Sequence, residues 1–232
     1  MIKQSGFWIG GKHSVEAAIL KKRRKIIQVI ALKKNKFLDD HCNNYEIKNE
    51  KFFNKIFYPS HIAHQGIAAL VSQLPKVSLD EIKEEKNIVL LDGITDPMNI
   101  GSIIRNCAAF NVQSIIVQDR EFNEKSSAMI KASSGAIETV KICKVSNLSS
   151  AIKYLKTKNF LVTCLDGQAS QNIHDSKWED KNLVIFGSEG DGVSNLIKKN
   201  SDRSLQIKIH ENIESLNVSN AVAITLFSLC NK

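Results

Sequence analysis

The sequence has few of the residues that build disulfide frameworks or zinc sites. Five cysteines are scattered over 232 residues, and none belongs to a CxxC pair. An odd number of dispersed cysteines argues against a disulfide framework and against structural zinc. His61 and His64, in SHIAHQG, have the spacing of a metal-binding pair, but no further ligands accompany them. We therefore expect no metal ion.

Long apolar runs are also missing. No segment approaches the roughly 20 apolar residues that a membrane helix needs. The first residues, MIKQSGFWIGGKHS, contain no continuous apolar stretch of signal-peptide length. We therefore expect no contact with a membrane and no export, and the reducing cytoplasm is the expected location.

Three common catalytic signatures are absent as well. The sequence contains neither the GxGxxG fingerprint of dinucleotide-binding enzymes nor a P-loop ending in Gly-Lys-Ser/Thr. No local pattern suggests a Ser-His-Asp triad. These absences argue against a nucleotide-binding oxidoreductase, a P-loop enzyme and a serine hydrolase.

Positive charge, in contrast, is concentrated at one end of the sequence. Residues 1–60 contain 13 Lys and Arg against 5 Asp and Glu, whereas residues 61–232 contain 19 of each kind. The run KKRRK at residues 21–25 can attract phosphates by Coulomb attraction and counterion release. The alternative is an ordinary solvated helix end. The residues predicted to contact a nucleic acid are Lys12, Lys22, Arg23 and Arg24.

The first 73 residues predict a small α/β domain. A loop with paired glycines leads into a helix, SVEAAILKK, for which Ser14 is a suitable N-cap. Further predictions are a strand at 25–32, a helix at 36–44 and a strand at 66–73. The polar, acid-rich segment 74–87 is predicted to be an interdomain linker containing a short helix.

Residues 88–232 show a regular alternation of short apolar strands and helices. Strands are predicted at 88–92, 114–118, 139–144, 160–165, 183–187 and 204–209. Helices are predicted at 99–110, 124–133, 147–157, 193–199 and 217–230. This alternation predicts an α/β fold in which helices cover both faces of a parallel sheet.

Ligands of such sheets bind in loops beyond the carboxyl ends of the strands. The first unusual loop spans residues 92–106, where Asn99 can cap the following helix. Arg105 is predicted to lie near the start of that helix, where the dipole favours anions, so its charge suggests a functional role. The alternative is an exposed arginine that pairs with Asp96 or Asp119.

Two further loops carry surplus polar groups. In FGSEGDGVS, residues 186–194, three glycines surround Glu189, whose carboxylate could orient a hydroxyl or an amine. The alternative is a glycine-rich hairpin. In residues 213–227 four polar residues stand before an apolar helix, although capping needs only one. They are Ser215, Asn217, Ser219 and Asn220. The helix is apolar nearly all round, which would let it pack on the sheet and on a second subunit.

These three loops, in this order, resemble the three motifs of the SpoU family of RNA ribose 2′-O-methyltransferases in the SPOUT superfamily. The segments that carry the resemblance are LDGITDPMNIGSIIRNCAAFNV, LVIFGSEGDGVS and ESLNVSNAVAITLF. KASSGAIE, residues 131–138, also resembles a family segment. Together they cover residues 88 to about 230.

The resemblance implies a SPOUT fold whose C-terminal part forms a trefoil knot, although knots are otherwise rare. It also implies that S-adenosylmethionine binds largely through backbone groups, and that the protein is a homodimer through the knot region, with the active site near the interface. The implied cofactor contacts are Leu165, Gly187, Ile207 and Leu216. The implied catalytic or RNA-contacting residues are Asn99, Arg105, Glu189, Ser215 and Asn217.

The N-terminal part is similar to the substrate-binding domain of bacterial 23S rRNA guanosine-2′-O-methyltransferases. IGGKHSVEAAI and HQGIAALV carry this shorter resemblance. It favours rRNA as the substrate, with tRNA methylation or a non-catalytic RNA-binding assembly factor as alternatives. The sequence departs from the family pattern in two places: HENIESLNVS lacks the usual glycine, and ETVKI lacks a frequent proline.

Overall fold

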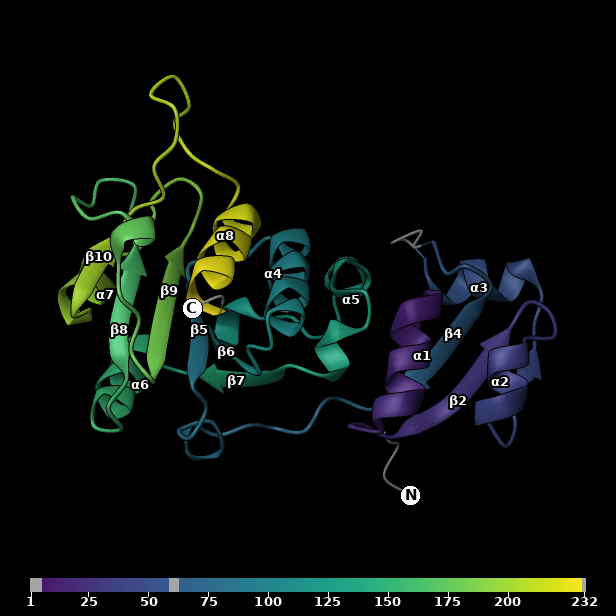
Figure 1. The fold of residues 1–232 in the computed structure, drawn as a ribbon. Helices are drawn as coiled ribbons and strands as arrows, with labels where there is room; N and C mark the ends of the chain where they lie inside the picture. The colour runs from purple at the N-terminus through teal and green to yellow at the C-terminus, as the bar shows by residue number, and fades with distance from the viewer. Residues whose placement is uncertain (1–5, 59–62, 231–232) are drawn as a thin grey trace. The chain divides into compact units, whose positions relative to one another are not determined.

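A computed structural model of the chain describes residues 6–58 and 63–230, so His61 lies outside the described residues. The described residues form two compact units (Figure 1). Unit 1 comprises those of Met1–Pro75 together with Glu124–Thr139. Unit 2 comprises those of Lys76–Asn123 and Val140–Lys232.

Unit 1 contains a four-stranded sheet in the order β1-β4-β2-β3. Its strands are β1 (Phe7–Gly10), β2 (Ile26–Ala31), β3 (Glu46–Ile47) and β4 (Ile67–Val71). The central β4 is antiparallel to both of its neighbours, and β3 is parallel to β2. This arrangement brings the ends of β1 and β2 to the same edge of the sheet, on either side of the start of β4.

Helices cover this small sheet. They are α1 (Lys12–Lys21), α2 (Lys36–His41) and α3 (Glu50–Ile56). Asn35 and Asn49 cap α2 and α3, each accepting a hydrogen bond from a backbone N–H three residues later. Phe53 of α3 is fully buried in a core with Ile30 and Ala68.

A segment from the second half of the sequence completes unit 1. It contains α5 (Ser127–Ser133) and the 3₁₀ turn η3 (Ala136–Glu138), and both contact α1. Glu138 forms a fully buried ion pair with Arg24. Gly135 has φ +88°, and a Cβ there would lie 2.7 Å from the Cβ of Ala17. This close approach requires glycine.

The structure corrects several predictions for unit 1. Residues 7–10 form strand β1 rather than a loop, β3 and α3 were not predicted, and α2 ends at His41 rather than residue 44. Strand β3 has only two residues, and both are exposed, so it buries no alternating apolar face. It therefore leaves no period-2 signal in the sequence.

Unit 2 is built on a six-stranded parallel sheet in the order β10-β8-β9-β5-β6-β7. The strands are β5 (Asn87–Asp92), β6 (Ser114–Gln118), β7 (Lys141–Val145), β8 (Leu161–Leu165), β9 (Asn182–Gly187) and β10 (Arg203–Leu205). The parallel sheet and its covering helices confirm the predicted α/β fold class.

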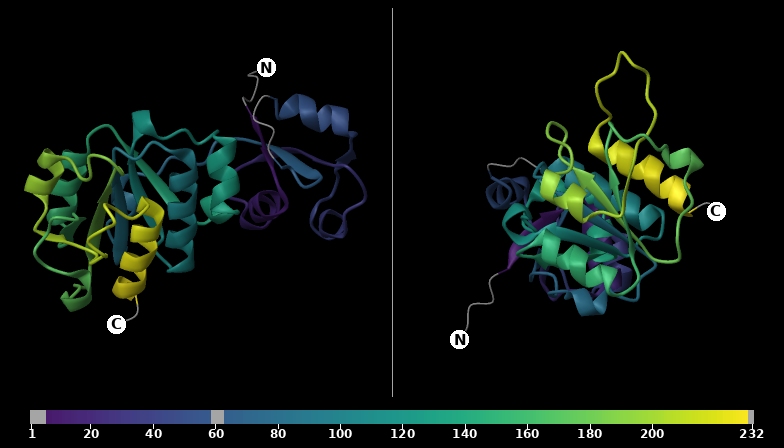
Figure 2. Two further views of the ribbon diagram at one scale, coloured as in Figure 1. Left: turned by 90° about the horizontal axis from the view of Figure 1, so that it is seen from above. Right: turned by 90° about the vertical axis from the view of Figure 1, so that its left-hand side faces the viewer.

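Side chains alternate between two buried faces of this sheet. Ile88, Leu90 and Leu183 point to a core shared with α6 (Leu148–Lys156) and α7 (Asn195–Asn200). The intervening Val89 and Leu91 are equally buried, as a strand covered on both faces requires. The remaining helices, α4 (Pro97–Ala109) and α8 (Val218–Cys230), pack on each other, and α8 also contacts β9 (Figure 2).

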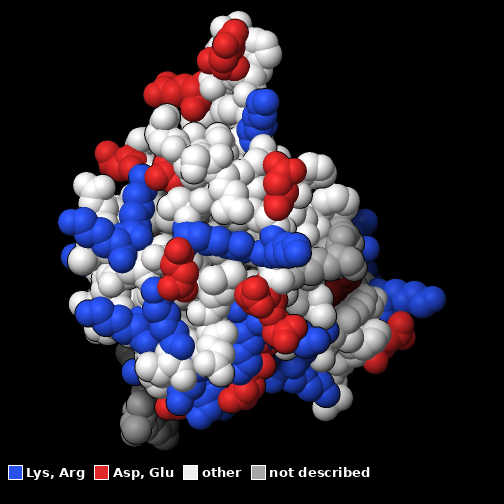
Figure 3. Space-filling model, turned by 60° about the vertical axis from the view of Figure 1, so that its left-hand side comes forward, with Lys and Arg blue, Asp and Glu red and all other residues white. Residues whose placement is uncertain are grey.

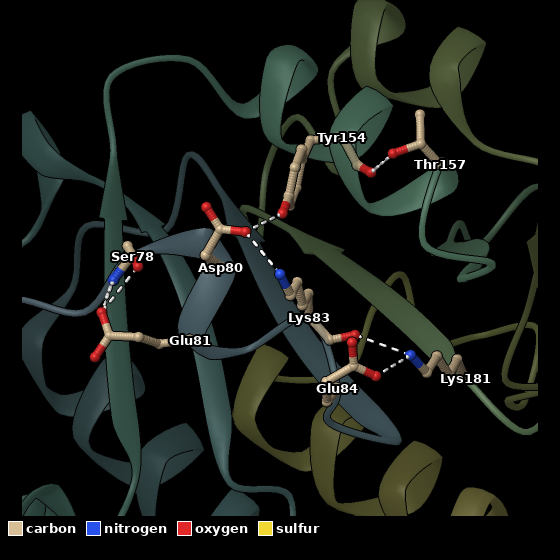
Figure 4. Close-up of polar contacts among 8 residues, drawn as sticks. All are labelled: Ser78, Asp80, Glu81, Lys83, Glu84, Tyr154, Thr157 and Lys181. Carbon is tan, nitrogen blue, oxygen red and sulfur yellow. Dashed lines mark hydrogen bonds and ion pairs between the residues drawn. The ribbon is translucent and has the colours of Figure 1, made fainter.

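Most of the predicted linker belongs to unit 2. Ile82, just after the 3₁₀ turn η1 (Leu79–Glu81), is fully buried in the core of this unit. Asp80 accepts hydrogen bonds from the Tyr154 hydroxyl and Lys83, and Glu84 pairs with Lys181 at 2.9 Å (Figure 4). The compact unit therefore begins at Lys76, about ten residues before the predicted domain.

The boundaries of two further elements differ from the predictions. Strand β10 ends at Leu205, so Ile207 lies in the following loop, and α5 begins at Ser127 rather than residue 124. In the described part of the chain no helix is long and apolar enough to span a membrane.

The Arg24–Glu138 pair makes a testable contribution to stability. Glu138→Ala would leave a guanidinium buried without its counter-charge, so we expect the free energy of unfolding to fall by about 3–5 kcal/mol. Urea unfolding monitored by circular dichroism measures this loss. The control is Glu46→Ala, which removes an exposed partner of Lys48 and should change stability little. Equal effects of the two substitutions would contradict the assignment.

Candidate active site

The three unusual loops converge in unit 2. β5 and β9 are neighbours, and Asp92 at the end of β5 lies opposite Gly187 at the end of β9. The loops that follow these strands therefore start side by side. α8 begins at Val218 and packs on α4, which brings the third loop to the same place.

A hydrogen-bonded triangle joins one residue from each loop. Asn99 Nδ2 donates to Glu189 Oε1 at 3.0 Å, and Asn217 Nδ2 donates to the same oxygen at 2.7 Å. Asn217 Nδ2 also donates to Asn99 Oδ1 at 2.9 Å. Three of the five predicted catalytic residues, separated by up to 118 positions, are thus in direct contact.

Asn217 has a second role as the cap of α8. Its Oδ1 accepts hydrogen bonds from the backbone N–H of Ser219 at 2.9 Å and from the Ser219 hydroxyl at 2.6 Å. Asn106 Nδ2 on α4 donates to the Ser219 carbonyl at 2.9 Å. The capped start of α8 is therefore fixed to α4, and the Asn217 amide is left to face Glu189.

Glu189 lies where two helix N-termini meet. Asn99 is the third residue of α4, and the N–H of Val218, the first residue of α8, is 3.4 Å from Glu189 Oε1. Helix N-termini attract negative charge, so both helix ends favour a carboxylate side chain at this position. Glu189 is exposed, and its Oε2 has no hydrogen-bond partner among the described residues. That oxygen is available to a ligand.

The start of α4 differs from the prediction. Asp96, not Asn99, is the N-cap, and its carboxylate accepts from the Asn99 backbone N–H at 2.9 Å. The Asn99 side chain is thereby freed for the triangle. Pro97 occupies the first turn, where a missing N–H costs nothing.

Arg105 lies outside the triangle. It is the ninth residue of α4, beyond the first two turns, so the helix-dipole reasoning used in its favour does not apply. It is six residues from Asn99, which places it about 9 Å further along the helix on another face. Arg105 is exposed, and it pairs with neither Asp96 nor Asp119 within the described structure. A ligand can therefore reach its guanidinium.

Ser215 also remains apart from the triangle. It is exposed in the segment between β10 and α8, two residues before Asn217, and makes no hydrogen bond to the described residues. That segment extends beyond the carboxyl ends of β8 and β9 (Figures 1 and 2).

The four predicted cofactor residues are half-buried around the same strand ends. Leu165 and Gly187 are the last residues of β8 and β9, and Leu165 pairs with Leu205 of β10. Ile207 and Leu216 lie in the loop after β10, where neither backbone N–H donates to any described residue. Half-buried backbone donors without partners suit a ligand that is recognised through the main chain.

Gly187 occupies a position that excludes every side chain. A Cβ there would overlap the backbone of Gly192 and Val193, because the loop after β9 folds back directly over Gly187. Gly192 N donates to the Ser188 carbonyl at 3.0 Å, which closes this loop. Asp92 holds its far end by accepting from Ser194 N at 2.8 Å.

Charged contacts stabilise the neighbouring loop after β8. Asp166 pairs with Lys198 of α7 at 2.6 Å and accepts from Gln168 N at 3.2 Å. Partial burial opposes its ionisation, but these contacts outweigh that effect and hold the pKa of Asp166 below its usual value. The carboxylate therefore stays charged and keeps the end of β8 in place.

Two buried cysteines of unit 2 are unsuited to nucleophilic catalysis. Burial raises the pKa of the Cys107 thiol in α4 strongly, and it raises the pKa of Cys143 to about 11. Both thiols thus remain protonated at neutral pH, whereas a cysteine nucleophile acts as a thiolate. The described residues contain no group of three or more His, Cys, Asp or Glu that could hold a metal.

The residues predicted to contact RNA do not form one cluster. Lys12 begins α1, whereas Lys22 follows its last residue, so about 15 Å of helix separates them. Arg23 is half-buried and donates to the Ile137 carbonyl at 3.4 Å. The prediction is wrong for Arg24, whose charged group is fully buried with Glu138 and lies 5.4 Å from the Phe7 ring.

Sequence reasoning missed several supporting residues. Asp92 and Asn106 bind backbone groups of the other loops, and Asp96 caps α4. For Asp96 a signal was present, because Asp followed by Pro is a common helix start. The partners of Asp92 and Asn106 lie 102 and 113 residues away, so no local pattern indicates them.

Comparison with known proteins identifies the family. The model of the SpoU rRNA methylase family matches residues 86–227. The chain belongs to this family. A TrmH family protein of Staphylococcus epidermidis is 30% identical over 97% of this chain and 95% of its own length. The 23S rRNA (guanosine-2′-O-)-methyltransferase RlmB of Vibrio cholerae is 34% identical over 71% of this chain and 69% of its own length. The chain is accordingly an RNA methyltransferase.

Solved structures of similar fold include two with S-adenosylmethionine bound. AviRb of Streptomyces viridochromogenes matches with a TM-score of 0.85 and 20% identity, over 97% of this chain and 89% of that chain. An rRNA methyltransferase of Sinorhizobium meliloti matches with a TM-score of 0.81 and 20% identity, over 97% and 86%. At this identity the likeness establishes the fold.

The closed loop over Gly187 predicts a sharp effect of one methyl group. Gly187→Ala must displace the backbone at Gly192 and Val193, so we expect affinity for S-adenosylmethionine to fall at least about tenfold, or 1.4 kcal/mol. Isothermal titration calorimetry measures this affinity. Gly190→Ala is the matched control, because a Cβ there meets open space and φ needs no glycine. Unchanged affinity in Gly187→Ala would refute the role of this loop.

Proposed function

We propose that this protein transfers the methyl group of S-adenosylmethionine to a ribose 2′-hydroxyl of a guanosine in 23S rRNA. The triangle of Asn99, Glu189 and Asn217 carries the proposal. It unites the polar residues of all three family motifs at the strand ends where this fold class binds ligands.

The proposed cofactor contacts are backbone groups. The half-buried residues Ile207 and Leu216 offer backbone N–H donors without partners among the described residues. Glycine at position 187 lets the Gly192–Val193 backbone close directly over the end of β9, which shapes the loop that would border the cofactor. The cofactor supplies an electrophilic methyl group on a sulfonium. The protein must therefore align the hydroxyl with that methyl and help the hydroxyl to lose its proton.

Glu189 and Arg105 have separate roles in this proposal. The free Oε2 of Glu189 accepts a hydrogen bond from substrate or cofactor, while Asn99 and Asn217 hold Oε1. Arg105 is exposed to the RNA side and stabilises negative charge on the ribose oxygen or a nearby phosphate. Because a guanidinium group is a poor proton acceptor, we assign the proton itself to a neighbouring group or water. Ser215 would contact RNA from the exposed segment.

We further propose that the active enzyme is a homodimer through α8. Ile224 and Phe227 leave 42% and 61% of their surface exposed on this helix, although its other side is buried. The Phe227 ring meets Phe110, at the end of α4, edge to face with centroids 6.4 Å apart. An exposed apolar stripe of this kind fits a subunit interface. The trefoil knot belongs to the same proposal, supported by the return of the chain from edge strand β10 to α8.

The choice of rRNA rests on unit 1. It provides a separate basic unit of the kind found in 23S rRNA methyltransferases, and the relative from Vibrio cholerae acts on 23S rRNA. Methylation of tRNA is the second candidate, because the relative from Staphylococcus epidermidis is described as a tRNA/rRNA methyltransferase.

Arg105 provides the sharpest test of the chemistry. Arg105→Ala removes an exposed charge from the proposed path of the RNA, so we expect turnover to fall about 10²–10³-fold with unchanged cofactor affinity. Turnover is measured as the rate at which labelled methyl groups pass from S-adenosylmethionine to RNA. Arg120→Ala, also exposed, is the control and should keep parental turnover. Near-parental turnover of Arg105→Ala would remove it from the mechanism.

The substrate is tested by mapping ribose methylation in a deletion strain. We expect one 2′-O-methyl mark to disappear from 23S rRNA and to return when the gene is restored. Restoration with the Arg105→Ala variant should leave the mark absent. Loss of a tRNA mark instead would establish the second candidate, and loss of no mark would favour an assembly factor without catalysis.

A further inference from the structure

Three short segments of unit 1 meet at one edge of its sheet. Gly11 N donates to the Ile67 carbonyl at 3.3 Å, and Leu32 N donates to the Gly66 carbonyl at 2.9 Å. The turn after β1 and the turn after β2 thus flank the start of β4. Because β1 and β2 are separated by a single strand, these turns lie about 10 Å apart.

Four lysines project from these turns. They are Lys12, Lys33, Lys34 and Lys36, and we call them the turn lysines. Lys12 opens α1, and the other three surround the start of α2. Lys12, Lys33, Lys34 and Lys36 are all exposed, and none forms an ion pair with any residue that the structure describes. Their charges are therefore available to a partner.

The turns that carry these lysines are fixed. Asn35 caps α2 through its side chain at 3.2 Å from Leu38 N, and its own N–H donates to the Tyr45 hydroxyl at 3.2 Å. At the other turn, Lys12 N donates to Gln65 Oε1 at 2.9 Å. A partner would meet these lysines on a backbone that is already ordered, which lowers the entropic cost of binding.

Acidic groups near the turn lysines are few. Glu16 is the only acidic residue between positions 6 and 38, and it is half-buried. Asp39 and Asp40 follow in α2, and Asp39 accepts the Tyr45 hydroxyl at 2.7 Å. At the same edge Glu46 pairs with Lys48, and Glu50 lies 3.6 Å from His64. The turn lysines thus carry the positive charges at this edge that no described carboxylate pairs with.

The C-terminal end of α1 carries the densest basic run in the sequence, but the arginines of this run already have partners. Arg24 is neutralised by Glu138, and Arg23 donates to a carbonyl oxygen of η3. Both arginines of the run are thus used inside unit 1. The two arginines of the run thus hold η3, and its lysines, Lys21, Lys22 and Lys25, are exposed.

We infer that the turn lysines form the surface through which unit 1 binds the phosphate backbone of the substrate RNA. This inference rests on the proposed function for the identity of the RNA. Lysine is a compact charge without the forked geometry that reads a base edge, so these contacts position the RNA and do not read its sequence. Binding through them depends on salt, because each neutralised phosphate releases counterions.

The test compares two double substitutions in the full chain. Lys33→Ala/Lys34→Ala removes two charges from the turns, and Lys21→Ala/Lys22→Ala removes two exposed charges from the other end of α1. Filter binding to protein-free 23S rRNA from the deletion strain is measured over a series of salt concentrations. For the first variant we expect affinity to fall about tenfold or more, and the slope of log K against log salt to fall by about 1.4–1.8.

Further readouts separate this inference from the proposed function. Lys33→Ala/Lys34→Ala should raise KM for RNA while kcat and affinity for S-adenosylmethionine stay parental, and Lys33→Arg/Lys34→Arg should restore KM. The Lys21→Ala/Lys22→Ala variant should bind like the parent, a result that would remove Lys22 from the residues predicted to contact RNA. Equal losses in both Ala variants, or no loss in the first, would overturn the inference. Absence of methyl transfer by the parent protein would refute the proposed function, while the binding comparison would still decide the role of the turn lysines.

Discussion

The active site depends on one oxygen atom, Oε1 of Glu189, which accepts hydrogen bonds from three donors in two segments of the chain. The donors are the side chain of Asn99 in α4, the side chain of Asn217 just before α8, and the backbone N–H of Val218, the first residue of α8. A negative group between the two helix N-termini favours their position against the glycine-rich loop, because both helix dipoles point their positive ends there. The carboxylate therefore fixes the loop and the two helices at once, while its second oxygen remains open to a ligand.

This contact in turn depends on strand order. β5 and β9 are far apart in the sequence but adjacent in the sheet, so the loop carrying Asn99 and the loop carrying Glu189 start at paired residues. Asn106 then fixes the start of α8 to α4 through the Ser219 carbonyl. Each supporting contact uses a backbone group as one partner. Substituting a single side chain would thus disturb the position of a loop as well as the chemistry of a residue.

The strand and helix pattern of unit 2 could be predicted from the sequence because both faces of its sheet are buried, which makes each strand an uninterrupted apolar run. The glycines around Glu189 and the polar residues at the start of α8 also indicated a ligand site, although Gly187 and Asn217 have structural roles as well. Contacts between distant residues could not be predicted in this way. Arg24 is the clearest case: in the sequence it is one of five adjacent basic residues, and only the fold brings Glu138, 114 positions away, against it. The resemblance to a known family identified Asn99 and Asn217, but not that they share one acceptor.

The burial of basic side chains in unit 1 lowers the positive charge that this unit presents at its surface. A count over the first 60 residues overstates the surface charge available to RNA, because one arginine is cancelled by a residue of the later segment and another is half-buried. Unit 2 carries mixed charges, and Figure 3 shows basic and acidic groups interspersed over the face that includes α6 and α7. A nearly neutral catalytic unit gains little long-range attraction for a polyanion. The energy that localises the substrate must then come largely from unit 1, where an ordered basic edge can hold phosphates without taking part in the reaction. Such an arrangement separates affinity for RNA from alignment of the ribose, since interactions equally strong before and during the reaction do not accelerate it.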